Sequence, residues 1–172
     1  DFSENSYGFR AEKNAGQAIS QIKAHLKQGF TEVYDADLSA YFDTIPHEKL
    51  MKALKERISD HRVLRLIKMW LQSPVSENGR ITGGKSTTCG TPQGGVISPL
   101  LANIYLNLFD RNVEKEGSLF AKEGVKIIRF ADDLVLMAKT ISETVKGKVG
   151  SLMERLDLTI NLEKTHILNA KD

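Results

Sequence analysis

The chain has 172 residues, of which 41% are hydrophobic, and its 24 basic and 22 acidic residues leave a formal net charge of +2. This composition excludes an intrinsically disordered chain and favours a globular protein with one domain or with two lobes that share a cleft. So small a net charge gives only weak general attraction to a polyanion, and no apolar run approaches the roughly 20 residues that cross a bilayer.

The start of the chain predicts a helix followed by a strand. Apolar residues recur at helical spacing over 15–26, and Gly29 stands where a helix commonly ends. The run 33–38 then alternates, so its even-numbered residues form an apolar face that should pack on helices. Its odd-numbered residues include Asp35 and Asp37, and we expect this acidic face to be open and to lie opposite the helices.

Two short helices and a hairpin should follow this strand. A proline at position 46 suits the first turn of a helix over 46–58, and Asp60 can cap a second helix that runs to Leu71. Short β-rich runs flank Gly83 and Gly84, so we expect a hairpin over 80–88 with its turn at these glycines.

The second half of the chain predicts a long helix and a central hairpin. Ser98 opens the helix, which continues to Phe109. Two β-rich runs, 125–130 and 134–137, are separated only by Ala131-Asp132-Asp133, which is the length of a hairpin tip. This tip therefore carries two adjacent carboxylates.

The end of the chain adds one more helix and two short strands. Thr140 and Glu143 form a capping box before a helix that runs to Leu156, and strands are expected over 158–160 and 165–168. Helices and antiparallel hairpins are thus interleaved along the chain. This order indicates an α+β fold and not a doubly wound parallel sheet.

Three carboxylates stand out because of where the predicted strands place them. Asp37 ends a strand on its open face, whereas Asp132 and Asp133 lie at a hairpin tip. A single aspartate at such a place is most often a turn former or a helix cap. Adjacent like charges repel unless a cation neutralises them, and oxygen ligands without His or Cys favour Mg²⁺. Two Mg²⁺ ions serve phosphoryl transfer, so we expect Asp37 to lie within a few ångströms of Asp132.

Five segments together resemble the motifs of reverse transcriptases, in the order in which that family carries them. In chain order they are Ser6-Tyr7-Gly8-Phe9-Arg10, Asp37-Leu38-Ser39-Ala40-Tyr41-Phe42-Asp43, Thr91-Pro92-Gln93-Gly94-Gly95, Phe130-Ala131-Asp132-Asp133 and residues 158–165. Any one motif is weak, but five in register cover nearly the whole chain. The residues of these motifs are most similar to those of reverse transcriptases of bacterial group II introns. The CRISPR-associated and diversity-generating reverse transcriptases stay open as alternative subfamilies.

The resemblance implies the fingers and palm of a polymerase, with an antiparallel palm sheet backed by helices and with the thumb absent. The expected parts are a partial fingers segment at 1–30, a first palm segment at 31–58, a return to the fingers with the hairpin at 59–90, and palm at 91–172. Because the chain opens on polar residues without Met, we expect a piece of a longer polymerase. Whether this piece is active alone is left open.

The family pattern also implies the metal ligands. Asp37 and Asp132 would hold two Mg²⁺ ions, for which Mn²⁺ can substitute. Asp133 would be a weaker ligand or a positioning residue, and the carbonyl of Leu38 would add a ligand. Without metal, the repulsion among these carboxylates should raise the pKa of at least one of them or draw in a Lys or Arg side chain.

Five further residues would contact the nucleotide by the same pattern. Arg10 would clamp the triphosphate, a task that suits a planar donor fork. Phe42 would act as a steric gate against a ribose 2′-hydroxyl and so favour deoxynucleotides. Gln93 and Gly94 would lie near the nascent base pair, and Lys164 would neutralise the leaving pyrophosphate and donate a proton to it. Without the resemblance, Phe42 reads as a core aromatic, and Arg10 and Lys164 read as surface residues.

The implied activity is that of an RNA-directed DNA polymerase, which extends a DNA primer with dNTPs on an RNA template and also serves its intron RNA as a maturase. Two alternatives remain. One is an RNA-binding splicing module without polymerisation, and the other is a palm-type nucleotidyl cyclase. A cyclase would lack the loop Pro92-Gln93-Gly94 and the aromatic residue at Phe42.

The single cysteine bears on the cellular compartment. Cys89 cannot form an internal disulfide, which fits a reducing environment. The N-terminus has no basic-then-apolar secretory pattern. We therefore expect a bacterial cytoplasmic protein without membrane contact, and the oligomeric state stays open.

Overall fold

The chain divides into two compact units. The computed structural model describes residues 1–77, 80–92 and 94–170. The first unit combines residues 1–39 with residues 106–172, and the second unit comprises residues 40–105. Helix α5 (Ser98–Glu114) contributes residues to both units. Over the described residues, no helix has the length and the apolar character that a bilayer crossing requires.

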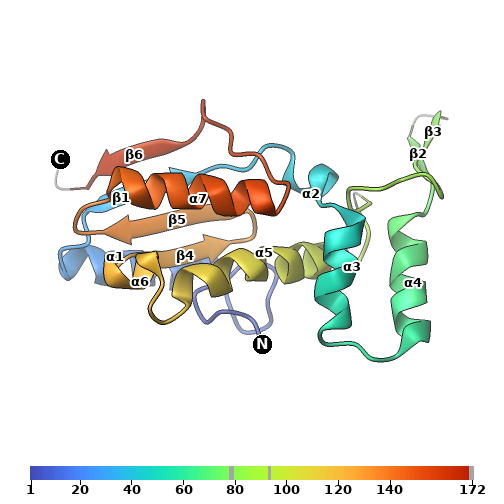
Figure 1. Ribbon diagram of the computed structural model, residues 1–172, viewed down its shortest axis with the longest axis horizontal. Coiled ribbons are helices and arrows are strands. Elements are labelled where there is room, and N and C mark those ends of the chain that lie inside the picture. The colour runs from blue at the N-terminus through green and yellow to red at the C-terminus, as the bar shows by residue number, and fades with distance from the viewer. Residues whose placement is uncertain (78–79, 93, 171–172) are drawn as a thin grey trace. The chain divides into compact units, whose positions relative to one another are not determined.

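A four-stranded antiparallel sheet forms the centre of the first unit (Figure 1). In spatial order its strands are β4 (Lys126–Phe130), β5 (Asp133–Ala138), β1 (Glu32–Ala36) and β6 (His166–Asn169). β1 pairs with β5 on one side and with β6 on the other, and both pairings are antiparallel. β4 and β5 form the predicted central hairpin. The expected α+β fold with an antiparallel sheet is confirmed.

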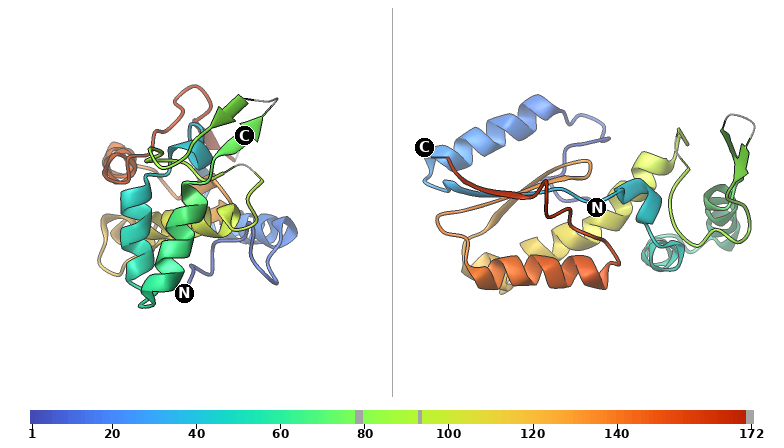
Figure 2. Two further views of the ribbon diagram at one scale, coloured as in Figure 1. Left: turned by 90° about the vertical axis from the view of Figure 1, so that its right-hand side faces the viewer. Right: turned by 90° about the horizontal axis from the view of Figure 1, so that it is seen from above.

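Helices cover both faces of this sheet. α1 (Ala15–Lys27) lies on one face, and α7 (Glu143–Arg155) lies on the other face together with the C-terminal part of α5 (Figure 2). Val33 and Val135 pack in an apolar cluster with Met137 and with residues of α1. Because side chains alternate along a strand, Asp35 and Asp37 share the face of Val33. The expectation that this face lies opposite all helices is therefore wrong, since α1 covers its Val33 end.

Local corrections concern the C-terminal part of the first unit. The cap of α7 is Ser142, whose Oγ accepts a hydrogen bond from the Val145 backbone at 3.1 Å, so the capping box at Thr140 is wrong. A one-turn helix, α6 (Leu119–Lys122), was not predicted. The strand expected over 158–160 does not form, and Ile160 makes only an isolated bridge to Leu38. The strand expected over 165–168 is confirmed as β6.

The second unit consists of short helices and a hairpin. Its helices are α2 (Tyr41–Thr44), which was not predicted, and α3 (His47–Lys55) and α4 (His61–Leu71), which were. Asp60 caps α4 as expected, while Pro46 is the N-cap of α3 and not part of its first turn. The predicted hairpin pairing is wrong, because β3 (Arg80–Thr82) pairs with the preceding β2 (Val75–Glu77). Gly83 and Gly84 follow β3 with φ of 82° and 104°, so they lead the chain out of the hairpin.

Candidate active site

The segments that carry the three aspartates are neighbours in the sheet. Asp35 pairs with Val135 and Ala36 with Leu134, so the next step of the antiparallel register brings Asp37 beside Asp133. Asp133 is the first residue of β5, and Asp132 lies in the turn that precedes it. Carboxylates that are far apart in the sequence therefore gather at one end of the sheet.

These carboxylates interact electrostatically. Burial raises the pKa of Asp133, and the negative charges of Asp132, Asp35 and Asp37 raise it further. The expected effect of crowded like charges on at least one carboxyl group is thus present. In the part of the chain that the structure describes, no group of three or more His, Cys, Asp or Glu side chains could hold a metal ion by itself. The donors are all oxygens, which suit Mg²⁺, an ion that retains waters and recruits substrate phosphates.

The backbone of Asp37 is fixed by the segment that precedes β6. The Asn161 nitrogen donates to the Asp37 carbonyl at 2.9 Å, and the Asp37 nitrogen donates to Thr165 Oγ1 at 3.3 Å. Leu38 forms an isolated β-bridge with Ile160 and its side chain is buried, whereas Lys164 is exposed. Asp37 therefore has a defined position although it lies one residue beyond the end of β1.

The hairpin tip that carries Asp132 is braced by two residues. Ala131 has a left-handed backbone with φ of 57°, which is costly for an L-residue other than glycine. Its carbonyl accepts a hydrogen bond from Nη1 of the buried Arg129 at 2.7 Å. Gly8 also packs against Ala131, so closely that a Cβ on Gly8 would lie 2.8 Å from Ala131 Cα. The sequence interpretation missed Arg129, although a charged residue inside an apolar strand signals a buried partner.

Arg10 folds back on the N-terminal segment of the first unit. Its Nη1 donates to the carbonyl oxygens of Ser3 and Ser6, the latter at 2.8 Å. Its guanidinium lies 5.4 Å from the centre of the Phe2 ring. An arginine carries five N–H donors, so these two hydrogen bonds do not exhaust its capacity to bind an anion.

Phe42 lies in α2 of the second unit and is half-buried. Its ring meets that of Tyr41 edge-on, with 5.7 Å between the ring centres. Tyr41 is buried and donates its hydroxyl hydrogen to the Ala102 carbonyl at 2.6 Å. The Phe42 carbonyl accepts from the Thr91 nitrogen at 2.7 Å and from Thr91 Oγ1 at 3.3 Å. Hydrogen bonds therefore tie the backbone of Phe42 to the start of the glycine-containing loop.

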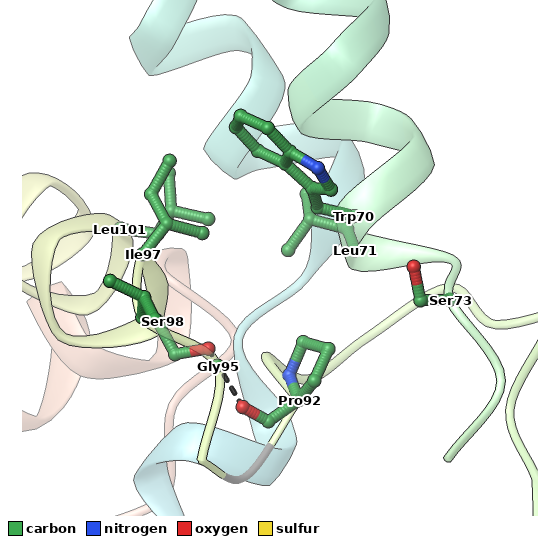
Figure 3. A pocket seen from close by; sticks show the side chains of 9 residues that line it. Trp70, Leu71, Ser73, Pro92, Gly95, Ile97, Ser98 and Leu101 are labelled. Atoms are coloured by element: carbon green, nitrogen blue, oxygen red, sulfur yellow. Dashed lines mark hydrogen bonds between the residues drawn. The ribbon is translucent and has the colours of Figure 1, made fainter.

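The loop that begins at Thr91 has a tight turn. Ser98 Oγ donates to the Pro92 carbonyl at 2.7 Å (Figure 3), and the Gly95 nitrogen donates to the same carbonyl at 3.1 Å. A Cβ on Gly95 would lie 2.6 Å from Ser98 Oγ, so a larger residue would displace this turn. Gly94 has a φ of 79°, which favours glycine. Gln93 lies outside the described residues.

An apolar pocket of about 460 Å³ lies beside this loop in the second unit. Trp70 and Leu71 from the end of α4 and Ile97 and Leu101 from around the start of α5 line it, as does Pro92 (Figure 3). Among the described residues, the pocket wall is almost entirely apolar and carries no cation, so it does not suit phosphate. We interpret it as packing that supports the loop.

The comparison with protein families decides the identity of this fold. The whole chain, residues 1–172, matches the family described as reverse transcriptase (RNA-dependent DNA polymerase). The chain belongs to the reverse transcriptase family. Its members are polymerases that depend on divalent metal ions, and the cyclase alternative is thereby excluded.

Individual proteins and a solved structure are also similar to this chain. Protein YkfC of Escherichia coli (strain K12) is 35% identical over 100% of this chain and 53% of its own length. The group II intron-encoded protein LtrA of Lactococcus lactis subsp. cremoris is 34% identical over 71% of this chain and 20% of its own length. The structure of apo telomerase from Candida tropicalis, truncated from its C-terminal domain, shares the fold with a TM-score of 0.69 at 15% identity, over 98% of this chain and 36% of that one.

The resemblance to group II intron-encoded reverse transcriptases is therefore confirmed, and so is the reverse transcriptase fold. The chain spans about half of YkfC and a smaller share of LtrA and of the telomerase chain. The activity and the partners of the whole protein are accordingly matters for proposal.

Proposed function

We propose that the full-length protein containing this chain is an RNA-directed DNA polymerase, which adds dNTPs to a primer on an RNA template. The observation that carries this proposal is the register of β1 and β5, in which Asp37 follows beside Asp133, next to the turn with Asp132. The effect of these charges on the pKa of Asp133 supports it. Carboxylates gathered at strand ends suit nucleotidyl transfer.

Two Mg²⁺ ions are the cofactor that this oxygen donor set fits, and Mn²⁺ can substitute. Asp37 and Asp132 would hold them together with the carbonyl of Leu38, and Asp133 would be a weaker ligand or a positioning residue. When bound, the ions stabilise charge on the attacking and leaving oxygens. The contribution of the chain is to hold the donors in place, as the hydrogen bond from Asp37 to Thr165 does.

The nucleotide contacts are proposed from the motif positions. Arg10 would bind the triphosphate with the N–H groups that its bonds to the N-terminal segment do not use. Phe42 would exclude a ribose 2′-hydroxyl, and Gln93 and Gly94 would lie against the nascent base pair. Lys164, whose side chain is exposed, would neutralise the leaving pyrophosphate and donate a proton to it.

The charge distribution supports RNA as the partner of the second unit. Residues 40–105 contain nine Lys and Arg against five Asp and Glu, a net charge of +4, whereas the first unit has a net charge of −2. The near-neutral total therefore conceals one basic unit. Phosphate backbones are attracted to positive net charge, and we propose that template RNA and intron RNA both bind this unit.

Primer extension with the full-length protein tests this function. With a DNA primer on an RNA template, we expect dNTP incorporation that stops when EDTA removes the divalent ions. A parallel splicing assay with the parent intron RNA measures the maturase role. Binding and splicing of RNA without any extension would favour the RNA-binding module and would overturn the polymerase assignment.

A further inference from the structure

Arg129 and Asp110 form a buried ion pair in the first unit. Their side chains are 0% and 1% exposed. Arg129 Nε donates to both carboxylate oxygens of Asp110 at 3.0 and 2.9 Å, and Nη2 donates to Oδ2 at 2.7 Å. Asp110 lies on α5 and Arg129 on β4, so the pair joins the helix layer to the edge strand of the hairpin.

Stability alone does not account for this pair. Removing two charges from water is costly, and well-packed apolar residues of similar volume often stabilise a core as well or better. Burial raises the pKa of Asp110, and the Arg129 charge opposes this shift by favouring the carboxylate. What an apolar pair cannot supply is a further, directed hydrogen bond to the neighbouring turn. Arg129 uses its Nη1 for such a bond, to the Ala131 carbonyl at 2.7 Å.

The bond from Arg129 reaches the turn residue with the least favourable backbone. Ala131 has a φ of 57° and immediately precedes Asp132, so any relaxation of this backbone would reorient the carboxylates that follow. Arg129 is itself held by its main chain. Its nitrogen donates to Asn5 at 2.9 Å, and its carbonyl accepts from the Tyr7 nitrogen at 2.8 Å. These hydrogen bonds fix the backbone of Arg129, and so they fix the position from which its guanidinium reaches the turn.

We propose that Arg129, oriented by Asp110, is a positioning residue that holds the Ala131–Asp132 turn in its active geometry. This inference rests on the proposed polymerase function. Arg129 touches neither substrate nor metal in this account, and its effect is transmitted through the backbone of Ala131. A displacement of about 1 Å at such a site can cost about a hundredfold in rate.

Three variants of the full-length protein separate positioning from folding. Arg129→Lys keeps the charge but replaces the planar fork by an ammonium, which cannot reproduce all of its directed bonds. Asp110→Asn keeps the size but weakens the orientation of Arg129. The double variant Asp110→Leu with Arg129→Met replaces the pair by an apolar contact. Val149→Ala, a buried change in α7, is the control for lost stability alone.

The readouts are kcat for primer extension, KM for primer–template, the Mg²⁺ concentration for half-maximal rate, and Tm, with rates measured well below each Tm. For Arg129→Lys and the double variant we expect kcat to fall at least tenfold, KM to change less than twofold, and the Mg²⁺ requirement to rise. Val149→Ala should lose stability without these changes. The inference would be overturned if the double variant kept the kcat and the Mg²⁺ dependence of wild type. It would also be overturned if Val149→Ala lost as much kcat as an Arg129 variant of the same Tm. A wild-type protein that makes no DNA would instead overturn the proposed function.

Discussion

Gly8 and Ala131 lie backbone against backbone, although one belongs to the N-terminal motif and the other to the hairpin tip. A Cβ on Gly8 would lie 2.8 Å from the Ala131 Cα and 3.0 Å from its Cβ, and closer still to its nitrogen. Residues 5–7 also run along β4, where Ser6 bridges to Arg129. The N-terminal motif thus packs directly on the turn that carries Asp132.

Gly8→Ala should therefore destabilise the chain and lower polymerase activity. The added methyl group has no space, and forced overpacking typically costs about 1–3 kcal/mol. Gly147→Ala is a matched control, because Gly147 is a helix residue in α7 with nothing within 4 Å of an added Cβ. It should raise stability by up to about 1 kcal/mol through helix propensity. Urea unfolding of both variants measures the difference, and equal stabilities would contradict the close contact.

Asp133→Asn should stabilise the metal-free chain at neutral pH. Because burial and nearby carboxylates raise the pKa of Asp133, its ionised form is less favourable in the folded chain than in the unfolded one. This cost is present above the folded pKa and disappears as the pH falls below the unfolded pKa of about 4. Thermal unfolding in EDTA should show a higher Tm for the Asp133→Asn variant than for wild type at pH 7, and no such difference at low pH. A lower Tm at pH 7 would contradict the raised pKa.

Local signals were sufficient for most elements of the fold. The apolar spacing of 15–26 and the Asp60 cap predicted α1 and α4 correctly, because both signals act within one helix. The glycines at 83–84 led to a wrong hairpin prediction. Glycines with positive φ occur where a chain leaves a hairpin as well as in the turn of a hairpin. β3 pairs with residues 75–77, and the glycines at 83–84 carry no signal for this pairing.

In the candidate site too, some features could be predicted from local sequence signals and others could not. The gathering of Asp37 and Asp132 at one end of the sheet was predictable because strand ends and the motif resemblance both mark these residues, and their role as metal ligands stays a prediction. The Arg129–Asp110 pair was not predictable, because its formation depends on which helix packs on the edge strand. The coverage of the acidic face was missed for the same reason, as Val33 alone does not reveal that α1 packs on it. Alternation within one strand cannot tell how many layers a sheet has.

Phe42→Ala in the full-length protein should raise ribonucleotide use while leaving dNTP use largely intact. The aromatic ring occupies the motif position of the sugar gate, and its edge-on contact with the buried Tyr41 keeps it in place. Single-nucleotide incorporation of rNTP and dNTP by wild type and variant measures this selectivity. Ile19→Ala removes an exposed apolar residue of α1 outside the motifs and serves as the control. Unchanged sugar discrimination in a folded Phe42→Ala variant would assign Phe42 to packing alone.

Mg²⁺ alone should stabilise this chain very little. The oxygen donors do not enclose a cation by themselves, and Mg²⁺ relies on substrate phosphates to complete its octahedron. Free ion below its Kd contributes less than about 0.4 kcal/mol by mass action. Thermal unfolding with EDTA and with millimolar Mg²⁺ gives the comparison, and the full-length protein should respond more once primer, template and nucleotide are present. A large shift with Mg²⁺ alone would reveal a preformed structural site.

Asp37 and Asp132 are proposed to act together as metal-holding carboxylates. Asp35 provides the matched control, because it lies on the same strand face as Asp37 and also contributes to the raised pKa of Asp133. The decisive measurement is the rate of RNA-templated primer extension by the full-length protein with Asp37→Asn, Asp132→Asn or Asp35→Asn, at saturating Mg²⁺. We expect the first two variants to lose at least about a thousandfold in rate, as when preorganised charge stabilisation is removed, while Asp35→Asn stays within about tenfold of wild type. Near-wild-type extension by the Asp37 or Asp132 variant would contradict this proposal.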